Sequence, residues 1–134
     1  MVNPADAKPV VTLLVVDDQP FFTTMLRNLL EQQGFKVFTA SNGPDGIKLA
    51  KQHKPTGILL DVEMPGMNGF AVCEALKSDE ATKAIPVMFL TSTADPKLNT
   101  KAFAAGAEST ALKTLSSERL VNLIRLTLSQ GKGS

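Results

Sequence analysis

Residues 57–70 read GILLDVEMPGMNGF, and this stretch contains the signals of a strand, a loop and the start of a helix. Its first part, Gly57–Leu60, is a continuous apolar run that ends at Asp61. A run without polar alternation is typical of a strand that is covered on both faces, as in a parallel sheet. Beyond the loop, apolar residues recur every three positions from Phe70 to Leu76, which predicts a helix. The stretch therefore predicts one strand and one helix, with an aspartate where the strand ends.

The same alternation extends along the chain in both directions. Apolar runs predict strands at Val11–Val16, Lys36–Thr39, Gly57–Leu60, Pro86–Leu90 and Glu108–Leu112. Helical spacing predicts helices that begin near Phe22, Pro44 and Phe70, and helices over Lys97–Ala104 and Ser117–Ser129. Five β-α units in series imply right-handed crossovers. The sequence therefore predicts an α/β fold built on a doubly wound, five-stranded parallel sheet.

The composition excludes several kinds of protein. The chain has 134 residues, of which 43% are hydrophobic and 20% charged, which is typical of one soluble globular domain. Its 14 Lys and Arg nearly balance its 13 Asp and Glu, so we expect no strong attraction to nucleic acid or to an anionic membrane. The single cysteine, Cys73, cannot form an intramolecular disulfide and fits a reducing cytoplasm. The apolar runs are too short to span a membrane.

Residues 10–129 are expected to form the folded domain. Residues 1–9 carry two prolines among small and charged residues, and predict a flexible lead-in. Residues 130–134, QGKGS, predict a flexible tail. No pattern of an output domain follows Ser129, so we expect a domain that acts by binding another protein, either alone or as a piece of a longer regulator.

Polar residues follow four of the predicted strands. Asp17 and Asp18 end the first strand, and Asp61 ends the third. Thr91 ends the fourth strand, and Lys113 follows the fifth. The carboxyl ends of parallel strands meet at one edge of the sheet, where the sites of such folds lie. We therefore expect three carboxylates, a hydroxyl and an amine at a single rim.

This set of side chains favours phosphoryl-transfer chemistry. Three neighbouring carboxylates repel one another unless a cation lies among them. Oxygen ligands without His or Cys select a hard ion, so Mg²⁺ is expected. Lys113 can neutralise one oxygen of an incoming phosphoryl group, and the Thr91 hydroxyl can donate a hydrogen bond to another. A carboxylate is also a competent nucleophile for forming an acyl phosphate.

The segments that carry these residues resemble the receiver domains of response regulators in two-component signalling. The segments are LLVVDDQP (residues 13–20), GILLDVEMPGMNGF (57–70), IPVMFLTS (85–92) and AGAESTALK (105–113). The resemblance extends from about Leu13 to Leu128. It implies the flavodoxin-like (β/α)5 fold of chemotaxis regulators, with strand order 2-1-3-4-5.

The resemblance also implies a role for each residue at the rim. Asp61 would be the phosphoacceptor, with Thr91 as the switch hydroxyl and Lys113 as the partner of the phosphoryl group. The Mg²⁺ ligands that the family pattern implies are Asp17, Asp18, Asp61 and the backbone carbonyl of Glu63.

The partners implied by the resemblance are proteins. The phosphoryl donor would be a phosphohistidine on a sensor histidine kinase or on a phosphotransfer protein, and the output would be altered binding to a downstream protein. Direct contact with nucleic acid or membrane is not expected. The face made by the fourth helix, the fifth strand and the fifth helix commonly pairs with a partner or a second copy, and here Lys97, Lys101 and Arg125 could contribute to it. Leu126 falls off the apolar stripe of the fifth helix, where we expect an exposed side chain.

Three positions depart from the family pattern. Receivers usually carry Tyr or Phe where this chain has Thr110, and the ring couples to the switch hydroxyl; the chain contains no Tyr. Proline usually follows the lysine, often through a cis bond, but Thr114 stands here. A cis bond before a residue other than proline costs about 2.5–4 kcal/mol, so we predict a trans peptide. Ser92 replaces the usual Ala after the switch threonine.

Because the ligand positions are intact, these departures concern the output. We hypothesise that phosphorylation reshapes the loop Ser92–Pro96 through Thr91 without burying an aromatic ring. Two other functions remain open. A pseudo-receiver would bind its partners constitutively, as the missing aromatic suggests. A Mg²⁺-dependent phosphatase with Asp61 as nucleophile would usually carry Asp two residues later on the first strand; here Glu63 follows on the third. We expect no enzyme beyond self-catalysed phosphoryl transfer and dephosphorylation.

Overall fold

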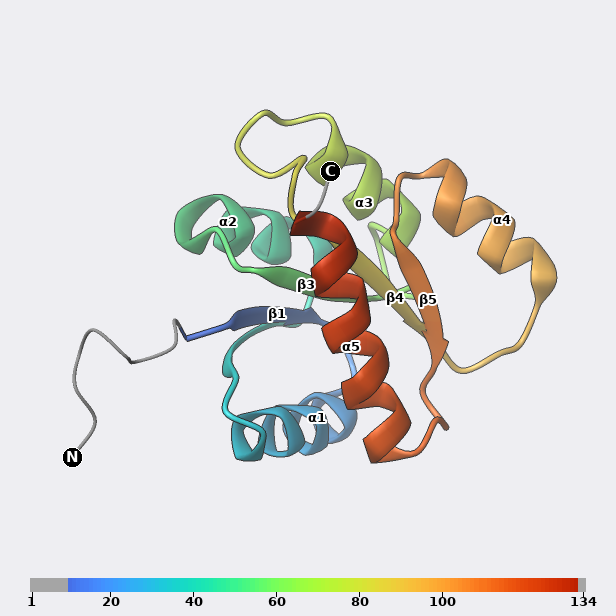
Figure 1. Ribbon diagram of the computed structural model, residues 1–134. Coiled ribbons are helices and arrows are strands. Elements are labelled where there is room, and N and C mark those ends of the chain that lie inside the picture. The colour runs from blue at the N-terminus through green and yellow to red at the C-terminus, as the bar shows by residue number, and fades with distance from the viewer. Residues whose placement is uncertain (1–9, 133–134) are drawn as a thin grey trace.

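The computed structural model describes residues 10–132, in which five strands alternate with five helices (Figure 1). The strands are β1 (Thr12–Val16), β2 (Lys36–Ala40), β3 (Gly57–Asp61), β4 (Val87–Thr91) and β5 (Ser109–Leu112). The helices are α1 (Pro20–Gln32), α2 (Gly43–His53), α3 (Gly69–Lys77), α4 (Pro96–Ala104) and α5 (Ser117–Lys132). All pairings are parallel and the strand order is β2-β1-β3-β4-β5. The predicted fold and the predicted strand order are confirmed.

The fifth helix is longer than predicted. It continues past Ser129 to Lys132, so the prediction that it ends at Ser129 was wrong. A glycine such as Gly131 costs a helix only about 1 kcal/mol and does not by itself end it. The flexible tail over residues 130–134 stays a prediction. The predicted lead-in, residues 1–9, and residues 133–134 lie outside the described residues. Within the described part of the chain, no helix is both long and apolar enough to cross a membrane.

The sheet is covered by helices on both faces, with α1 and α5 on one side and α2, α3 and α4 on the other (Figure 1). In β1, Leu13 and Val15 pack with the α1 and α5 side chains, whereas Leu14 and Val16 pack on the opposite face. Successive side chains of a strand point to opposite faces, so one unbroken apolar run supplies both halves of the core. With both faces covered, the strand ends are left as the place for polar chemistry.

The turn into α3 brings its first residue against the end of β3. A side chain at Gly69 would overlap the backbone oxygen of Asp61, so only glycine fits this close approach. The Gly69 N–H donates to the Val62 carbonyl at 2.9 Å. The Asn68 side chain caps α3 by accepting a hydrogen bond from the backbone N–H of Ala71 at 3.0 Å. The Asn-Gly pair in the quoted stretch therefore sets where Asp61 lies relative to α3.

Candidate functional site

Three carboxylates lie together at the carboxyl edge of the sheet. Asp17 directly follows β1 and is 2% exposed, while Asp61 is the last residue of β3 and is 6% exposed. The strand order places β1 beside β3, with Val16 opposite Leu60, so these distant parts of the chain become neighbours. Ligand oxygens of Asp17, Asp18 and Asp61 all lie within 4.8 Å of one another. One small cation could therefore contact all three.

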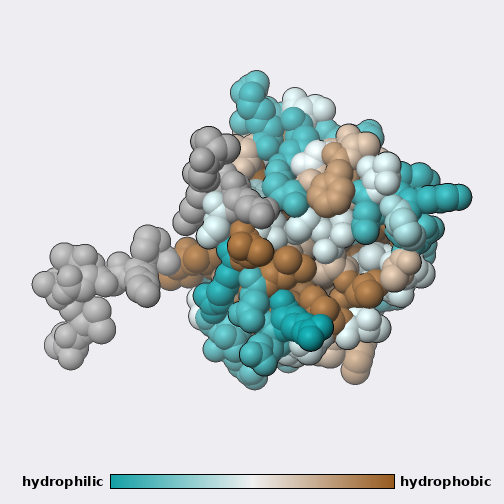
Figure 2. Space-filling view, turned by 45° about the vertical axis from the view of Figure 1, so that its right-hand side comes forward, coloured by the Kyte–Doolittle hydropathy of each residue, from teal (hydrophilic) through white to brown (hydrophobic). Residues whose placement is uncertain are grey.

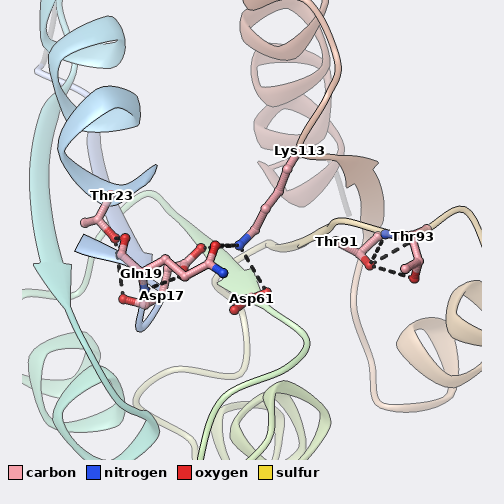
Figure 3. A network of polar contacts seen from close by, with 7 residues as sticks. All are labelled: Asp17, Gln19, Thr23, Asp61, Thr91, Thr93 and Lys113. Atoms are coloured by element: carbon pink, nitrogen blue, oxygen red, sulfur yellow. Dashed lines mark hydrogen bonds and ion pairs between the residues drawn. The ribbon is translucent and has the colours of Figure 1, made fainter. Parts of the chain in front are cut away.

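The Lys113 ammonium lies between two of these carboxylates, those of Asp17 and Asp61 (Figure 3). Its Nζ lies 2.7 Å from Oδ2 of Asp17 and 3.4 Å from Oδ1 of Asp61, and its side chain is only 10% exposed. The backbone N–H of Lys113 donates to the Thr91 carbonyl at 2.8 Å, which continues the pairing of β5 with β4. This hydrogen bond fixes the point from which the lysine side chain reaches back toward β3 and β1.

One ammonium does not compensate three carboxylates. Burial, and next the charge of Asp17, raise the pKa of the Asp61 carboxyl from 3.8 to about 6, although Lys113 acts in the opposite direction. Oδ2 of Asp17 is buried and, among the described residues, takes part in no hydrogen bond of good geometry despite its ion pair with Lys113. The site therefore favours a further positive charge.

These residues fit Mg²⁺. The clustered ligands are carboxylate oxygens alone, without His or Cys, and oxygen ligands are the ones that hard divalent cations prefer. A buried carboxylate oxygen without a hydrogen bond is a ready ligand, because metal coordination would satisfy it. The predicted ligand set is thus brought together for Asp17, Asp18 and Asp61.

Thr91 reaches the same rim, but its hydroxyl is turned toward the loop after β4. The Thr91 Oγ1 accepts a hydrogen bond from the backbone N–H of Thr93 at 3.2 Å and lies 3.3 Å from the Thr93 carbonyl oxygen, to which it donates. No hydrogen bond joins Thr91 to Asp61 within residues 10–132, and Figure 3 shows the Thr91–Thr93 contacts as a separate group. The threonine hydroxyl therefore has to turn before it can meet a group on Asp61.

Glu63 lies in the loop between β3 and α3, and its side chain is exposed. The loop borders an open cavity of about 440 Å³, which is lined by Val62, Glu63, Met64, Pro65, Asn68, Phe70 and Leu98. The Glu63 side chain is not part of the clustered carboxylates. A metal contact through its backbone carbonyl stays a prediction.

The two unusual positions on either side of Lys113 have defined surroundings. The Thr110 hydroxyl, on β5, donates to Oδ1 of Asn99 on α4 at 2.9 Å. Where receivers usually carry an aromatic ring, this chain therefore has a hydrogen bond between β5 and α4. The peptide before Thr114 is trans, as predicted, because the described residues contain no cis peptide bond.

Two residues that the sequence reasoning did not assign to the site lie against the Lys113 ammonium. Oε1 of Gln19 accepts a hydrogen bond from Nζ at 3.1 Å. The ring centroid of Phe22 lies 4.5 Å from Nζ, with the ammonium over the ring. One signal in the sequence could have indicated Gln19, because it precedes Pro20 at the position where a helix usually has Ser, Thr, Asp or Asn as its cap.

The sheet order, the covered faces and the acidic rim define a flavodoxin-like α/β domain with an acidic pocket at the carboxyl ends of its strands. Comparison with known families agrees with this class, because the response regulator receiver domain matches residues 13–125. The chain therefore belongs to the response regulator receiver domains of two-component systems. The predicted resemblance is confirmed.

The chain is also similar to individual regulators in sequence and in structure. Protein PilH of Pseudomonas aeruginosa is 45% identical over 80 residues, which cover 60% of this chain and 66% of PilH. The DNA-binding dual master transcriptional regulator RpaA of Synechocystis is 34% identical over 116 residues, which cover 87% of this chain and 48% of RpaA. The chain thus spans less than two-thirds of each relative. The chemotaxis protein CheY4 of Vibrio cholerae has a similar structure, with a TM-score of 0.85, 27% identity, and coverage of 89% of this chain and 99% of that one.

Proposed function

We propose that this receiver domain accepts a phosphoryl group on Asp61 from a phosphohistidine and signals through a change in its binding to another protein. The observation that carries the proposal is the placement of the Asp61 carboxylate, 3.4 Å from the Lys113 ammonium and inside a cluster of carboxylates that fits Mg²⁺. A strand-end carboxylate beside a fixed cation can act as a nucleophile toward phosphorus while the cation neutralises phosphoryl charge. The donor would be a sensor histidine kinase or a phosphotransfer protein.

The transfer exchanges one bond to phosphorus for another. A carboxylate oxygen of Asp61 bonds to phosphorus while the bond from phosphorus to the imidazole nitrogen breaks. The electron pair of that bond stays on the nitrogen, which then takes up a proton. Lys113 neutralises one phosphoryl oxygen, and the Thr91 hydroxyl donates to another after it turns away from Thr93.

The proposed metal ligands are Asp17, Asp18, Asp61 and the backbone carbonyl of Glu63. When bound, Mg²⁺ would neutralise charge on the phosphoryl oxygens. The protein's own part is to keep the acidic oxygens together and nearly dry, which the burial of Asp17 and Asp61 supports.

The test is the intact mass of the protein after incubation with Mg²⁺ and acetyl phosphate. We expect a transient adduct of about 80 Da, the mass of one phosphoryl group. Asp61→Asn should abolish the adduct because it removes the nucleophile. Asp95→Asn is the matched control: Asp95 is an exposed carboxylate that caps α4, and Asn caps equally well. The control should form the adduct as the unchanged protein does.

The same experiment separates the two other functions. Absence of an adduct in the unchanged protein would support a pseudo-receiver that binds its partners constitutively. Turnover of many phosphomonoesters per protein molecule would support a phosphatase. Neither outcome agrees with the proposed function, in which one phosphoryl group is held on Asp61 and then lost by self-catalysed dephosphorylation.

We further propose that the signal leaves the site through the loop Ser92–Pro96. The Thr91 hydroxyl is hydrogen-bonded to the backbone of Thr93 in this loop. When the hydroxyl turns toward a phosphoryl group, these hydrogen bonds break, and they are contacts that shape the loop. The loop leads into α4, which the hydrogen bond from Thr110 to Asn99 ties to β5. Here a hydroxyl-to-amide contact, rather than an aromatic ring, would adjust to the new loop position.

Amide chemical shifts with and without beryllofluoride, a mimic of the phosphoryl group, test this route. We expect changes that extend from Asp61 through the Ser92–Pro96 loop to Asn99. Thr110→Val keeps the shape of the side chain but removes the hydroxyl, so the chemical-shift change at Asn99 on adding beryllofluoride should fall by half or more. Lys101→Met, an exposed change on the same helix, should leave the response intact. Changes confined to the metal pocket would contradict the route.

The proposed surface for the downstream partner is the face made by α4, β5 and α5. Figure 2 brings this side of the molecule forward and shows brown apolar side chains among teal polar ones. Phe103 on α4 and Leu126 on α5 are 54% and 57% exposed, which agrees with the prediction for Leu126. A loop change before α4 would move the α4 part of this face. A second copy of the chain is the other partner that we propose for it.

A further inference from the structure

The position of the Lys113 ammonium is set by more than the carboxylates. Lys113 follows the edge strand β5, and its side chain crosses the rim to reach the residues after β1. Four groups surround its Nζ: two carboxylates, the amide oxygen of Gln19 and the ring of Phe22. Gln19 and Phe22 are uncharged, and both belong to the start of α1.

Gln19 is the N-cap residue of α1, yet its side chain makes no capping hydrogen bond. The side chain of an N-cap residue normally accepts a hydrogen bond from a backbone N–H in the first turn of the helix. Pro20 has no backbone N–H, so the first turn of α1 has one donor fewer that needs an acceptor. The Gln19 backbone is held instead, because its N–H donates to Oδ1 of Asp17 at 2.9 Å and its carbonyl accepts from the Thr23 hydroxyl at 3.0 Å. The amide oxygen of the side chain is therefore free to accept from Lys113, as Figure 3 shows.

Phe22 is half-buried and packs against the core on the α1 and α5 side of the sheet. Its ring is thus held by packing, and its face meets the Lys113 ammonium at 4.5 Å. The neighbouring Phe21 is 85% exposed on the same helix, which gives a natural control. A cation over an aromatic face is attracted by the ring quadrupole, and more strongly when water is excluded.

We propose that Gln19 and Phe22 are positioning residues that keep the Lys113 ammonium beside Asp61 for phosphoryl transfer. This inference rests on the proposed function. The ion pair of Lys113 with Asp17 weakens once a divalent cation shares that carboxylate, because the carboxylate charge is then largely neutralised. The contacts with Gln19 and Phe22 do not depend on carboxylate charge. They therefore hold the ammonium in the state in which the transfer occurs.

The experiment compares rate constants for phosphorylation of Asp61 at saturating acetyl phosphate and Mg²⁺. Phe22→Leu keeps an apolar side chain but loses the ring face, and we expect a roughly threefold to tenfold lower rate constant. Gln19→Leu loses the acceptor at an exposed position whose side chain does not cap α1, and we expect a rate constant about threefold lower. Phe22→Tyr restores the ring and should restore the rate. Phe21→Leu should leave the rate unchanged.

A double-mutant cycle separates positioning from a general structural effect. In a Lys113→Met background, Phe22→Leu and Gln19→Leu should each lower the residual rate by less than about twofold. A spectroscopic readout needs no phosphorylation: the ring current of Phe22 should shift the Lys113 Hε resonances upfield, and Phe22→Leu should remove that shift.

The outcomes distinguish the two levels of the proposal. If the unchanged protein forms no adduct on Asp61, the proposed function fails and this inference fails with it. If the unchanged protein is phosphorylated and both leucine variants keep its rate, only the positioning role is overturned. If the two leucine variants lower the phosphorylation rate by the same factor with Lys113 present and in the Lys113→Met background, the positioning role is also overturned, because the variants then act through the fold.

Discussion

Lys113→Met is expected to slow phosphorylation of Asp61 roughly 100-fold, the size of effect seen when one charge-stabilising group is removed from a transfer site. The ammonium lies 3.4 Å from Oδ1 of Asp61, where it can neutralise the negative charge of a phosphoryl oxygen during the transfer. Methionine is nearly as long but neutral, so it fills the same space without compensating that charge. The measurement is the rate constant for adduct formation at saturating acetyl phosphate and Mg²⁺.

The same substitution should tighten Mg²⁺ binding and lower the unfolding free energy of the metal-free protein. Nζ of Lys113 lies 2.7 Å from Oδ2 of Asp17 and thus competes with a metal for that buried oxygen. Without the ammonium, we expect Mg²⁺ affinity to rise about tenfold. Breaking a buried ion pair leaves uncompensated charge, so we expect a loss of about 3 kcal/mol in unfolding free energy without metal. Saturating Mg²⁺ should return most of that loss.

Competition between Lys113 and the metal therefore predicts opposite changes in Lys113→Met: a lower phosphorylation rate and a higher Mg²⁺ affinity. Isothermal titration gives the affinity, and urea denaturation followed by far-UV circular dichroism gives the stability, since the chain has no Trp or Tyr for fluorescence. Lys97→Met, at an exposed lysine on α4, should alter neither quantity. Weaker Mg²⁺ binding by Lys113→Met would contradict competition between the ammonium and the metal.

Asp61→Asn is expected to stabilise the metal-free protein by about 3 kcal/mol at pH 8. The folded protein raises the pKa of Asp61 from 3.8 to about 6, mainly by burial and next through the charge of Asp17. An ionised Asp61 therefore costs folding free energy. Asn has nearly the same shape and removes that cost, at the expense of the proposed nucleophile.

The gain should depend on pH in a defined direction. Between pH 3.8 and about 6 the folded protein binds the Asp61 proton and the unfolded chain does not, so the wild-type protein loses stability as pH rises through this window. Below pH 3.8 both states are protonated, and the difference between the two proteins should vanish. Above about pH 6 the difference should be complete and constant.

Urea denaturation at a series of pH values, in a chelating buffer, measures this effect. Asp95→Asn should show no gain at any pH, because the Asp95 side chain is exposed to water and is not buried beside other carboxylates. Saturating Mg²⁺ should shrink or reverse the advantage, since the metal stabilises only a protein that keeps its ligands. Equal stability of wild type and Asp61→Asn at pH 8 without metal would contradict the electrostatic cost.

Most of the fold could be predicted from local sequence. Continuous apolar runs such as Gly57–Leu60 indicate strands that are covered on both faces, and the helical spacing between the runs allows only a parallel sheet with crossovers. The rim could be predicted for the same reason, since parallel strands deliver Asp17 and Asp61 to one edge. The end of α5 was missed, because a glycine near a helix end lowers helix stability without a defined stopping point.

The sequence alone determined which groups reach the rim, because strands that all run in one direction deliver Asp61 and the other strand-end residues to the same edge. Only the tertiary structure decided how those groups meet. The Thr91 hydroxyl faces Thr93, and the Lys113 ammonium rests on Gln19 and Phe22. Such contacts depend on side-chain rotamers and on packing between residues far apart in the chain, and local periodicity carries no information about either.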